Sequence, residues 1–563
     1  MSINSVSVAP FSLPPTLGNG SSSTTSIVAV AEDMKASQYL LTPLCALAPG
    51  LGRCAAAATS SASADGEKCS SLVDRLQLDN TTVYSTSFIP AGTNLSLAEN
   101  DPTCGPSSQL VRSDICRVTM LITTSPSSNI SFEAWLPLDW SGRFLGTGNG
   151  GLNGCIHYDH LDYGSLHGFA TVGTNNGHNG TSGRPFYENP GVLEDYVYRS
   201  IHLEAELGKQ IARQFYGREH TKSYYLGCST GGRQGFKSAH DFPSDFDGIV
   251  AGAPAFNLNA LMYWTGQMFI KTGSTDSPRF LDSAAWDLVY ADILEQCDGL
   301  DGLEDGILED PDLCQYRPEN LLCGSGRSSG CLTGEQAETV RAIFSPVYGA
   351  DGELVYPRFQ PGANSTAGLF AGAPHPYPTD WFRYVVYGDE TWDPATLNVQ
   401  DWVAADELNP FNSATWEGDL SAARDAGTKI LHYHGLQDPA ISSDNSARYY
   451  DYVSRTMDAS SDDLDGFYRY FRISGLGHCN SGSGANLIGA DQDTYATYDP
   501  DANVLAAVVR WVEDGVAPDH ILGSRKTAAG KTDISRRHCR YPRRNRYKGE
   551  GDPAVPDSWE CVF

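Results

Sequence analysis

Ser229 lies in a glycine-rich turn whose pattern is typical of a catalytic nucleophile. Residues 227–231 read Gly-Cys-Ser-Thr-Gly, between the run Ser223–Leu226, which favours a strand, and the helix-compatible run Arg233–His240. Glycines two positions either side of a serine permit the strained strand-to-helix turn called a nucleophile elbow. The same five residues also fit an ordinary turn. The prediction therefore depends on partners elsewhere in the chain.

Two later segments offer those partners. An elbow serine needs an acid and a base, which in α/β hydrolases follow in the order Ser, Asp, His. The apolar run Lys429–His434 is followed by Asp438, and the run Phe467–Ile473 is followed by His478. Each residue stands just past an expected strand, where α/β sheets gather their functional groups. The sequence therefore predicts a triad with Asp438 as acid and His478 as base.

The sequence also offers two other histidines as bases, and backbone N–H groups for an oxyanion hole. His432 and His434 lie inside an expected strand and are predicted to pack in the core. Thr230 begins the helix after the elbow, so its N–H is expected to face the developing negative charge. The expected strand 143–147 runs into the glycine-rich stretch 148–151, where α/β hydrolases place a second N–H donor. Gly150 or Gly151 is expected to supply it, and a tight turn is the alternative.

Two cysteines flank the predicted catalytic residues. Cys228 immediately precedes Ser229, and Cys479 immediately follows His478. A disulfide between them would join nucleophile and base covalently. The combination Cys-Ser, then Asp, then His-Cys resembles the signature of the tannase and feruloyl esterase family of serine esterases. This resemblance extends from about residue 68 to residue 563 and implies an α/β-hydrolase fold with a large lid domain inserted.

The resemblance also implies a function. Members of that family cleave gallate, hydroxycinnamate or related aromatic esters. Tannases tend to carry an acidic residue after the nucleophile, whereas this chain has Thr230. The resemblance thus favours a secreted esterase acting on feruloyl and p-coumaroyl esters of plant cell-wall polysaccharides, with tannase as the alternative. A secreted peptidase and a calcium-stabilised binding protein without activity are the other classes, and the intact triad argues against the second.

Fourteen cysteines are many for a cytosolic enzyme and favour an oxidising compartment with disulfides. The family resemblance implies six pairs: Cys69 with Cys116, Cys104 with Cys155, Cys228 with Cys479, Cys297 with Cys314, Cys323 with Cys331, and Cys539 with Cys561. It leaves Cys45 and Cys54, which both fall in a suspected signal region. Sequons at Asn80, Asn94, Asn129, Asn179 and Asn364 agree with secretion.

An acidic stretch from Cys297 to Ile307 suggests a hard cation. It concentrates aspartates and glycines, and Ca²⁺ takes carboxylate and backbone oxygens in loops of this kind. The aspartate spacing is not that of an EF-hand loop. The family resemblance implies side-chain ligands from Asp298, Asp301 and Asp305, and backbone ligands from Leu303 and Ile307. A solvated acidic turn is the alternative, and the expected role is structural.

Alternating strands and helices before Pro254 and after Thr428 predict a largely parallel sheet covered on both faces. Between them the alternation breaks down, so we expect an inserted lid over residues 255–427. The two parts of the catalytic domain are then 66–254 and 428–563. Ile130–Leu136 alternates apolar and polar residues before a proline, which favours an edge strand. Aromatic residues of the lid are candidates for a ring-binding wall: Tyr263, Trp264, Phe269, Trp381, Tyr384 and Trp392.

The N-terminal region is expected to lie outside the folded enzyme. Residues 1–33 are rich in Ser, Thr and Pro and are predicted to be a disordered leader or extension. Residues 34–65 resemble a signal peptide with alanine-rich cleavage sites, so translation is suspected to start at Met34. No apolar run reaches the length of a membrane span.

The formal net charge of −29 argues against a nucleic-acid partner, because no broad basic surface is available to neutralise phosphates. The basic stretch Arg536–Lys548 is expected to be solvated or to pair with the acidic body. The expected partner is therefore a small aromatic ester or an esterified polysaccharide. Neither nucleic acid nor membrane is expected, and the sequence assigns no oligomeric state.

Overall fold

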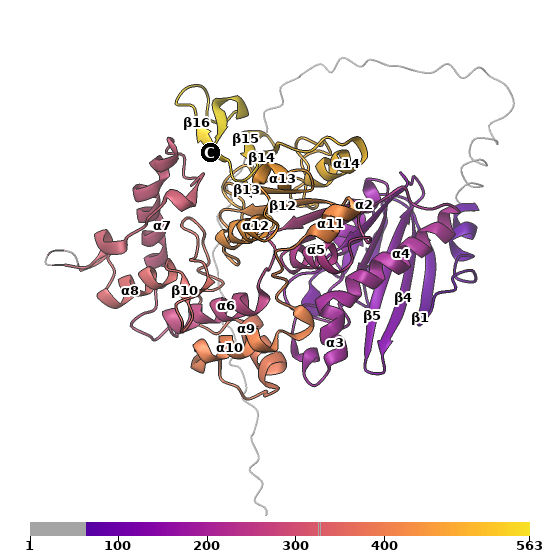
Figure 1. Ribbon diagram of the computed structural model, residues 1–563, viewed down its shortest axis with the longest axis horizontal. Coiled ribbons are helices and arrows are strands. Elements are labelled where there is room, and N and C mark those ends of the chain that lie inside the picture. The colour runs from indigo at the N-terminus through magenta and orange to yellow at the C-terminus, as the bar shows by residue number, and fades with distance from the viewer. Residues whose placement is uncertain (1–63, 325, 327) are drawn as a thin grey trace, which may run out of the picture. The chain divides into compact units, whose positions relative to one another are not determined.

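A nine-stranded mixed sheet forms the centre of the computed structural model, which describes residues 64–324, 326 and 328–563. Figure 1 shows the sheet with helices packed across it. The strands are β1 (Thr81–Ile89), β4 (Ile115–Ser125), β5 (Ser128–Pro137), β6 (Arg143–Thr147), β7 (Phe169–Thr174), β8 (Lys222–Cys228), β9 (Gly248–Gly252), β12 (Lys429–Gly435) and β13 (Tyr468–Ile473). The predictions of residues 1–33 and of a signal region from residue 34 fall on residues outside those described, apart from 64 and 65.

The spatial order of the strands is β1-β4-β5-β7-β6-β8-β9-β12-β13. In this spatial order, β1, β4, β5 and β7 are each antiparallel to the next. The six strands β7, β6, β8, β9, β12 and β13 are parallel to one another. The central strands β7 and β9 are buried on both faces along their whole length, as their short apolar sequences favour. Together with the helices that cover it, this sheet confirms the predicted α/β-hydrolase fold.

Helices cover both faces of the sheet, and neighbouring residues of one strand face different helices. Tyr225 of β8 belongs to the apolar core beneath α4, α5 and α12, whereas Tyr224 and Leu226 belong to the core beneath α2 and α14. This alternation follows from the two-residue period of a strand. The bounds of these helices are α2 (Tyr158–Leu166), α4 (Ser200–Tyr216), α5 (Thr230–Asp241), α12 (Asp444–Thr456) and α14 (Val504–Asp514).

Between β9 and β12 the chain leaves the sheet and forms a helical insertion. Its elements are α6 (Leu258–Thr272), α7 (Ser283–Cys297), α8 (Gly334–Ile343), the hairpin β10 (Val347–Tyr348) and β11 (Leu354–Tyr356), α9 (Pro376–Asp380), a π-helix (Trp381–Tyr387), α10 (Val399–Leu408) and α11 (Ser421–Ala426). The insertion has an apolar core of its own, which also takes in Leu152, Tyr196 and Ile441 from the catalytic part. It therefore packs directly against the catalytic part of the chain. The boundaries 255–427 stay a prediction.

Smaller elements complete the fold. They are the hairpins β2 (Asn94–Ser96) with β3 (Ser108–Leu110), β14 (His520–Lys526) with β15 (Thr532–Cys539), and β16 (Arg544–Tyr547) with β17 (Trp559–Val562), and the short helices α3 (Pro190–Glu194) and α13 (Ser461–Leu464). All six predicted disulfides form. Within the described residues, no helix is both long enough and apolar enough to span a membrane.

One local prediction about the sheet was wrong. The strand ending at Pro137 is not at an edge: β5 lies third in the sheet, between β4 and β7. Proline is tolerated there because it is the last residue of the strand, where the ladder ends. The third position also explains why β5 is buried on both faces over its second half.

Candidate active site

Ser229 occupies a strained elbow between β8 and α5. Its backbone angles are φ 64° and ψ −121°, a conformation that costs a non-glycine residue energy and must be held by its surroundings. The Ser229 N–H donates to the Gly252 carbonyl at 2.9 Å, and its carbonyl accepts from Ala255 at 3.0 Å. These bonds to the next strand and its exit fix the turn.

The glycines around the elbow are required by close backbone contacts. A Cβ atom on Gly227 would lie 2.7 Å from the backbone of Gly231, and one on Gly232 would lie 2.3 Å from the Gly252 carbonyl oxygen. Real Cβ atoms do not approach backbone so closely. Strand, turn and helix therefore meet only because these positions lack side chains, which is the physical content of the pattern seen in the sequence.

The residues predicted to give backbone N–H groups to an oxyanion lie in one cavity with Ser229. Thr230 is the first residue of α5, so its N–H has no acceptor within the helix. The amides of Gly150 and Gly151 donate to no acceptor among the described residues. The hydroxyl of Thr230 donates to the Gly151 carbonyl at 2.7 Å. This bond joins the elbow to residues 148–151, which we call the glycine loop. All three predicted donors, with Ser229, line one cavity.

Hydrogen bonds of Asn149 hold the glycine loop in place. The Asn149 N–H donates to Gln234 Oε1 of α5 at 3.0 Å, and its amide Nδ2 donates to the carbonyls of Cys155 and Thr174. Asn149 is only 3% exposed. Preorganised donors of this kind stabilise developing charge without reorganising during the reaction.

Asp438 and His478 form a short hydrogen bond. His478 Nδ1 lies 2.7 Å from Asp438 Oδ2, and Asp438 is fully buried. Asp438 Oδ1 accepts from the N–H groups of Ala440 and Ile441 at 2.7 and 2.9 Å. An ionised carboxylate only accepts hydrogen bonds, so His478 Nδ1 carries the proton and Nε2 is left as a base.

His434 is a second partner of the same carboxylate. Its Nε2 lies 3.0 Å from Asp438 Oδ2, and its Nδ1 lies 2.7 Å from the Ser446 hydroxyl. The prediction that His432 and His434 are buried core residues is confirmed, because both are 0% exposed. The contact of His434 with Asp438 was not predicted. His434 and Asp438 are four residues apart, on either side of the end of β12, and this spacing is not a recognisable motif.

Asp438 and His478 shift each other's pKa. Burial raises the pKa of Asp438, but the charge of His478 and the hydrogen bonds from His434 and His478 together hold it well below its usual range. Burial lowers the pKa of His478, yet the charge of Asp438 and the hydrogen bond to it leave that pKa above its ordinary value. Asp438 is therefore ionised, as an acid that stabilises an imidazolium must be.

The disulfide Cys228–Cys479 joins the neighbours of Ser229 and His478 across a sequence separation of 251 residues. Both cysteines line the cavity that contains Ser229 and His478. Cys479 has a φ of 65°, a left-handed conformation unusual for a residue with a side chain. The bond therefore fixes the loop that carries His478 onto the elbow.

We expect removal of this disulfide to cost both stability and turnover. The Cys228→Ala/Cys479→Ala variant should lose about 2–5 kcal/mol of unfolding free energy. Its kcat should fall roughly 10- to 100-fold, because small displacements of a base are costly. Denaturant unfolding and ester kinetics measure the two effects. The matched control is the Cys539→Ala/Cys561→Ala variant. Its disulfide has a sequence separation of 22 residues and does not line the cavity, so this variant should lose stability alone. Equal losses of kcat in both variants would contradict a positioning role.

The cavity has a volume of about 410 Å³ and two chemically different walls. Apolar and ring-bearing side chains come from the insertion and from the loop after β12, namely Leu261, Met262, Leu369, Tyr377 and Ile441. A polar wall is formed by Asn153, His157, Asp159, His160, Asp491 and Asp493. Neither wall was predicted from the sequence.

The proposed aromatic wall was wrong. None of the six aromatic candidates in the insertion lines the cavity. Trp264 and Trp381 are instead 0% exposed in the core of the insertion, where large rings bury the most surface. Tyr377, which was not singled out, reaches the site: its hydroxyl would lie 2.3 Å from a Cβ on Gly151.

The acidic loop forms a compact set of turns. Asp298 Oδ2 accepts from the Gly306 N–H, Asp301 from Leu303 and Glu309, and Asp305 from Ile307. Asp298 Oδ1 is buried without a hydrogen-bond partner. Burial, then the nearby Glu309 and Asp305, raises the pKa of Asp301 to about 7. Arg536 neutralises part of this charge through ion pairs with Asp305 and Glu309, as predicted for the basic stretch.

A family model described as tannase and feruloyl esterase matches residues 116–562. The chain belongs to the tannase and feruloyl esterase family. Among curated proteins of this family, "Probable feruloyl esterase B-2" of Aspergillus oryzae is 51% identical over 500 residues, covering 88% of this chain and 95% of that protein. "Probable feruloyl esterase B" of Emericella nidulans is 52% identical over 500 residues, covering 88% of this chain and 94% of that protein.

Solved structures of this tannase and feruloyl esterase family agree with the fold. Feruloyl esterase B from Aspergillus oryzae superposes with a TM-score of 0.87 at 46% identity, covering 88% of this chain and 100% of that one. Tannin acyl hydrolase from Aspergillus niger superposes with a TM-score of 0.70 at 22% identity, covering 88% of this chain and 95% of the other. The second likeness concerns the fold alone.

Proposed function

We propose that this chain is a secreted serine carboxylesterase that hydrolyses feruloyl and p-coumaroyl esters of plant cell-wall polysaccharides. Ser229 is the nucleophile, His478 the base and Asp438 the acid. The observation that carries this proposal is the 2.7 Å contact of His478 Nδ1 with a buried Asp438, in one cavity with a serine on a strained elbow. The feruloyl esterase names of relatives that are about half identical support the substrate class.

The first step forms an acyl-enzyme. His478 Nε2 takes the proton of the Ser229 hydroxyl as its oxygen attacks the ester carbonyl carbon. The negative charge on the former carbonyl oxygen is held by the N–H of Thr230 and that of Gly150 or Gly151. Collapse of this intermediate breaks the bond to the alcohol, which leaves with the proton from His478.

Water completes the cycle. It attacks the acyl carbonyl while His478 again accepts a proton. The bond to Ser229 then breaks, His478 returns the proton to the Ser229 oxygen, and the acid is released. Asp438 holds the imidazole in the required tautomer throughout and stabilises its cation. His434 shares this carboxylate and acts as a positioning residue, because it touches neither substrate nor nucleophile.

The cavity and one position next to the nucleophile also support the substrate assignment. The apolar wall of Leu261, Met262 and Ile441 suits an aromatic ring and its propenoyl link. Thr230 follows the nucleophile, where an acidic residue would favour the tannase branch. Tannase, acting on gallate esters, is the alternative, because the matching family model covers tannases as well as feruloyl esterases.

A panel of methyl esters tests the function. We expect the purified protein to hydrolyse methyl ferulate and methyl p-coumarate with kcat/KM at least roughly tenfold above methyl gallate, a difference of about 1.4 kcal/mol in transition-state binding. Casein serves as the peptidase control and should not be cleaved. Hydrolysis of gallate alone would move the assignment to tannase. Cleavage of casein without any ester hydrolysis would overturn it.

Calcium binding is a second part of the proposal. Asp298, Asp301 and Asp305, with the carbonyls of Leu303 and Ile307, hold Ca²⁺ in the acidic loop, where the ion neutralises carboxylates and stabilises the insertion. The fit is supported by the unpartnered Asp298 Oδ1. It is also supported by the two carbonyls, which accept no hydrogen bond within the described part of the chain.

Removal of calcium should therefore destabilise the protein. We expect the chelator EGTA to lower Tm, and added CaCl₂ to restore it, with about 2.7 kcal/mol of stabilisation at 100 times Kd. Asp301→Asn should abolish the response. The matched Asp287→Asn variant changes an exposed aspartate on α7 of the same insertion and should respond like the parent. An unchanged Tm with EGTA in the parent would exclude a structural calcium ion.

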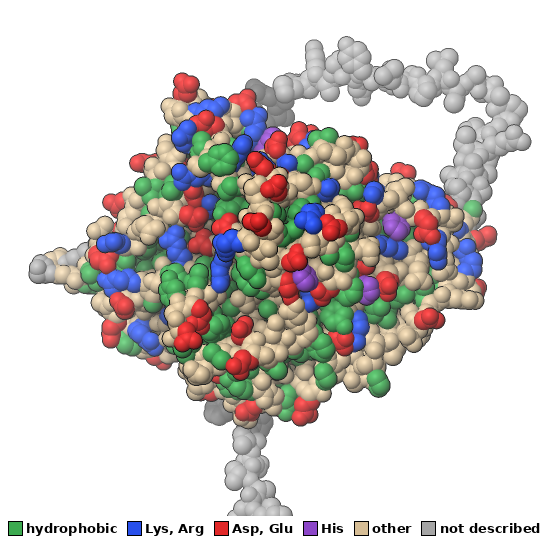
Figure 2. All heavy atoms as spheres, viewed as in Figure 1, with side chains coloured by type: hydrophobic (Ala, Val, Ile, Leu, Met, Phe, Trp, Pro, Cys, Tyr) green, Lys and Arg blue, Asp and Glu red, His purple; other side chains and the backbone are tan. Residues whose placement is uncertain are grey.

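Secretion completes the proposal. Six disulfides require an oxidising compartment, and all five predicted sequon asparagines are exposed: Asn80, Asn94, Asn129, Asn179 and Asn364. On the face shown in Figure 2, basic and acidic side chains are interspersed, so that face offers no continuous basic patch for nucleic acid. The suspected signal region itself lies outside the described residues.

A further inference from the structure

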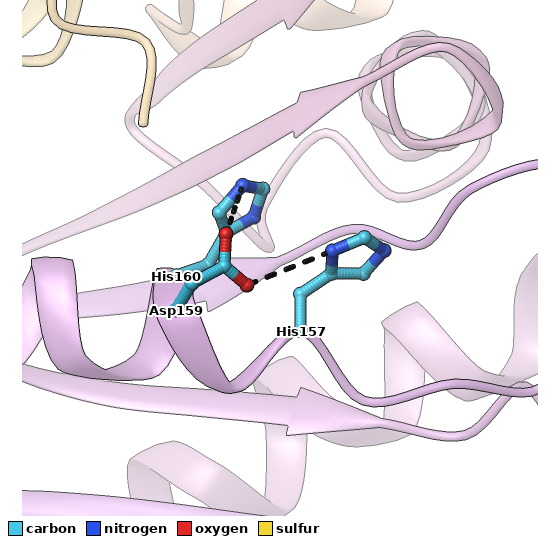
Figure 3. A group of neighbouring side chains, drawn as sticks. All are labelled: His157, Asp159 and His160. Carbon is cyan, nitrogen blue, oxygen red and sulfur yellow. Dashed lines mark ion pairs between the residues drawn. The ribbon is translucent and has the colours of Figure 1, made fainter. Parts of the chain in front are cut away.

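His157, Asp159 and His160 form a cluster at the start of α2, on the polar wall of the cavity. His157 is the residue before the helix, and the other two lie in its first turn. Figure 3 shows both imidazole rings on either side of the Asp159 carboxylate. Among the described residues, this is the one group of His, Cys, Asp or Glu side chains with three potential ligand atoms within 4.8 Å of one another.

The distances in the cluster suit a shared ion better than direct hydrogen bonds. His157 Nδ1 lies 3.8 Å from one oxygen of Asp159, and His160 Nε2 lies 3.8 Å from the other. Hydrogen bonds of this type are about 2.7–3.2 Å long. Ligand atoms on one tetrahedral ion at bond lengths of about 2.0–2.2 Å are roughly 3.3–3.6 Å apart. Small side-chain adjustments would therefore close the cluster around an ion.

Both imidazoles lack hydrogen-bond partners. His157 Nε2 and His160 Nδ1 are buried without a partner among the described residues, and their other ring nitrogens are too far from Asp159 to bond it. His160 is only 9% exposed. The ring nitrogens that face Asp159, His157 Nδ1 and His160 Nε2, likewise make no hydrogen bond within the described part of the chain, so both can coordinate an ion.

The surroundings of the cluster add negative charge. Asp491 lines the same cavity and is 9% exposed. One of its carboxylate oxygens accepts from the Thr494 N–H and hydroxyl, while the other accepts no hydrogen bond in the described chain. His157 Nε2 would lie 3.7 Å from a Cβ on Gly150, so the cluster adjoins the glycine loop.

We propose that His157, Asp159 and His160 bind a divalent transition-metal ion of the zinc type in the wall of the cavity. Two imidazoles and one carboxylate are a ligand set that zinc accepts, whereas Ca²⁺ and Mg²⁺ prefer oxygen ligands alone. The site is thus chemically distinct from the acidic loop. Three protein ligands leave a coordination position open toward the cavity, available to water or to an oxygen ligand.

Calorimetry tests this proposal. The full chain, stripped with EDTA, desalted and supplied with CaCl₂ to fill any oxygen site, is titrated with ZnCl₂. We expect the parent to bind one Zn²⁺ more per chain than the His157→Gln/His160→Gln variant. Its affinity at that site should be roughly 100-fold or more above that of the variant, since loss of second-shell partners alone costs about 10–100-fold. The His240→Gln variant, which changes a histidine outside the cavity, should bind like the parent.

Co²⁺ provides a second readout. The visible absorption of Co²⁺ bound to the parent should be lost in the double variant and in Asp159→Asn, while thermal unfolding reports whether each variant is folded. If the double variant does not fold, the Asp159→Asn protein carries the comparison. Zinc binding that is absent in the parent, or equal in parent and folded variants, would overturn the proposal.

Discussion

Replacement of Ser229 with alanine should lower kcat for methyl ferulate by roughly 10⁴- to 10⁶-fold. The hydroxyl is the atom that attacks the ester, and no other side chain can take its place on the elbow. The backbone hydrogen bonds that Ser229 donates to Gly252 and accepts from Ala255, which fix the turn, involve no side-chain atom of Ser229. Steady-state and single-turnover hydrolysis measure the effect, with Tm expected to be unchanged.

An exposed serine outside the cavity provides the matched control for this variant. Ser483 is exposed, hydrogen-bonded to Gln437, and does not line the cavity. Ser483→Ala should therefore retain kcat within about twofold, since surface changes away from a site have small effects. If Ser229→Ala kept more than a few per cent of the activity, another residue would have to be the nucleophile.

Asp438→Asn should lower kcat by about 10⁴-fold, the effect of the equivalent change in another Ser-His-Asp triad. The amide can keep the bonds from the N–H groups of Ala440 and Ile441. Its NH₂ then replaces the oxygen that faces His478 and His434, and an NH₂ group only donates. His478 Nδ1 must become an acceptor, which moves its proton to Nε2 and removes the base.

The pH profile separates this effect from misfolding. In the parent, burial lowers the pKa of His478, while the charge of Asp438 and the hydrogen bond to it leave that pKa above the ordinary value. Activity requires neutral His478, so it is lost as pH falls through this raised pKa. Without the carboxylate only the lowering effect of burial remains, and the acid limb of kcat/KM should move to lower pH. A limb that stayed in place would contradict an electrostatic role for Asp438.

The sequence predicts the parts of the site that depend on local geometry. Gly227, Gly231 and Gly232 surround Ser229 because no side chain fits at the crossing of β8, α5 and β9, so the pattern itself carries the conformation. Asp438 and His478 follow apolar strands, and strand ends meet at one edge of a parallel sheet. The six disulfides followed from the family resemblance, since spacing alone does not define pairing.

The rest depends on contacts between distant segments. His434 touches Asp438 because β12 ends in a tight loop, and nothing in its side-chain type distinguishes it from buried His432. The lid aromatics fill the core of the insertion, whereas Leu261, Met262 and Tyr377 reach the cavity. Which face of a helix meets the site is set by tertiary packing. The sequence of α6 does not encode this face, because most residues of that helix are buried.

Covalent labelling of the nucleophile tests the central claim most directly. The parent is incubated with an aryl phosphonate ester, which is attacked by activated serines and gives a stable adduct, and then digested and sequenced by mass spectrometry. We predict a single adduct on Ser229, formed in step with the loss of methyl ferulate hydrolysis and absent from the Ser229→Ala protein. Inactivation with the adduct on another residue would contradict the assignment of Ser229 as the nucleophile.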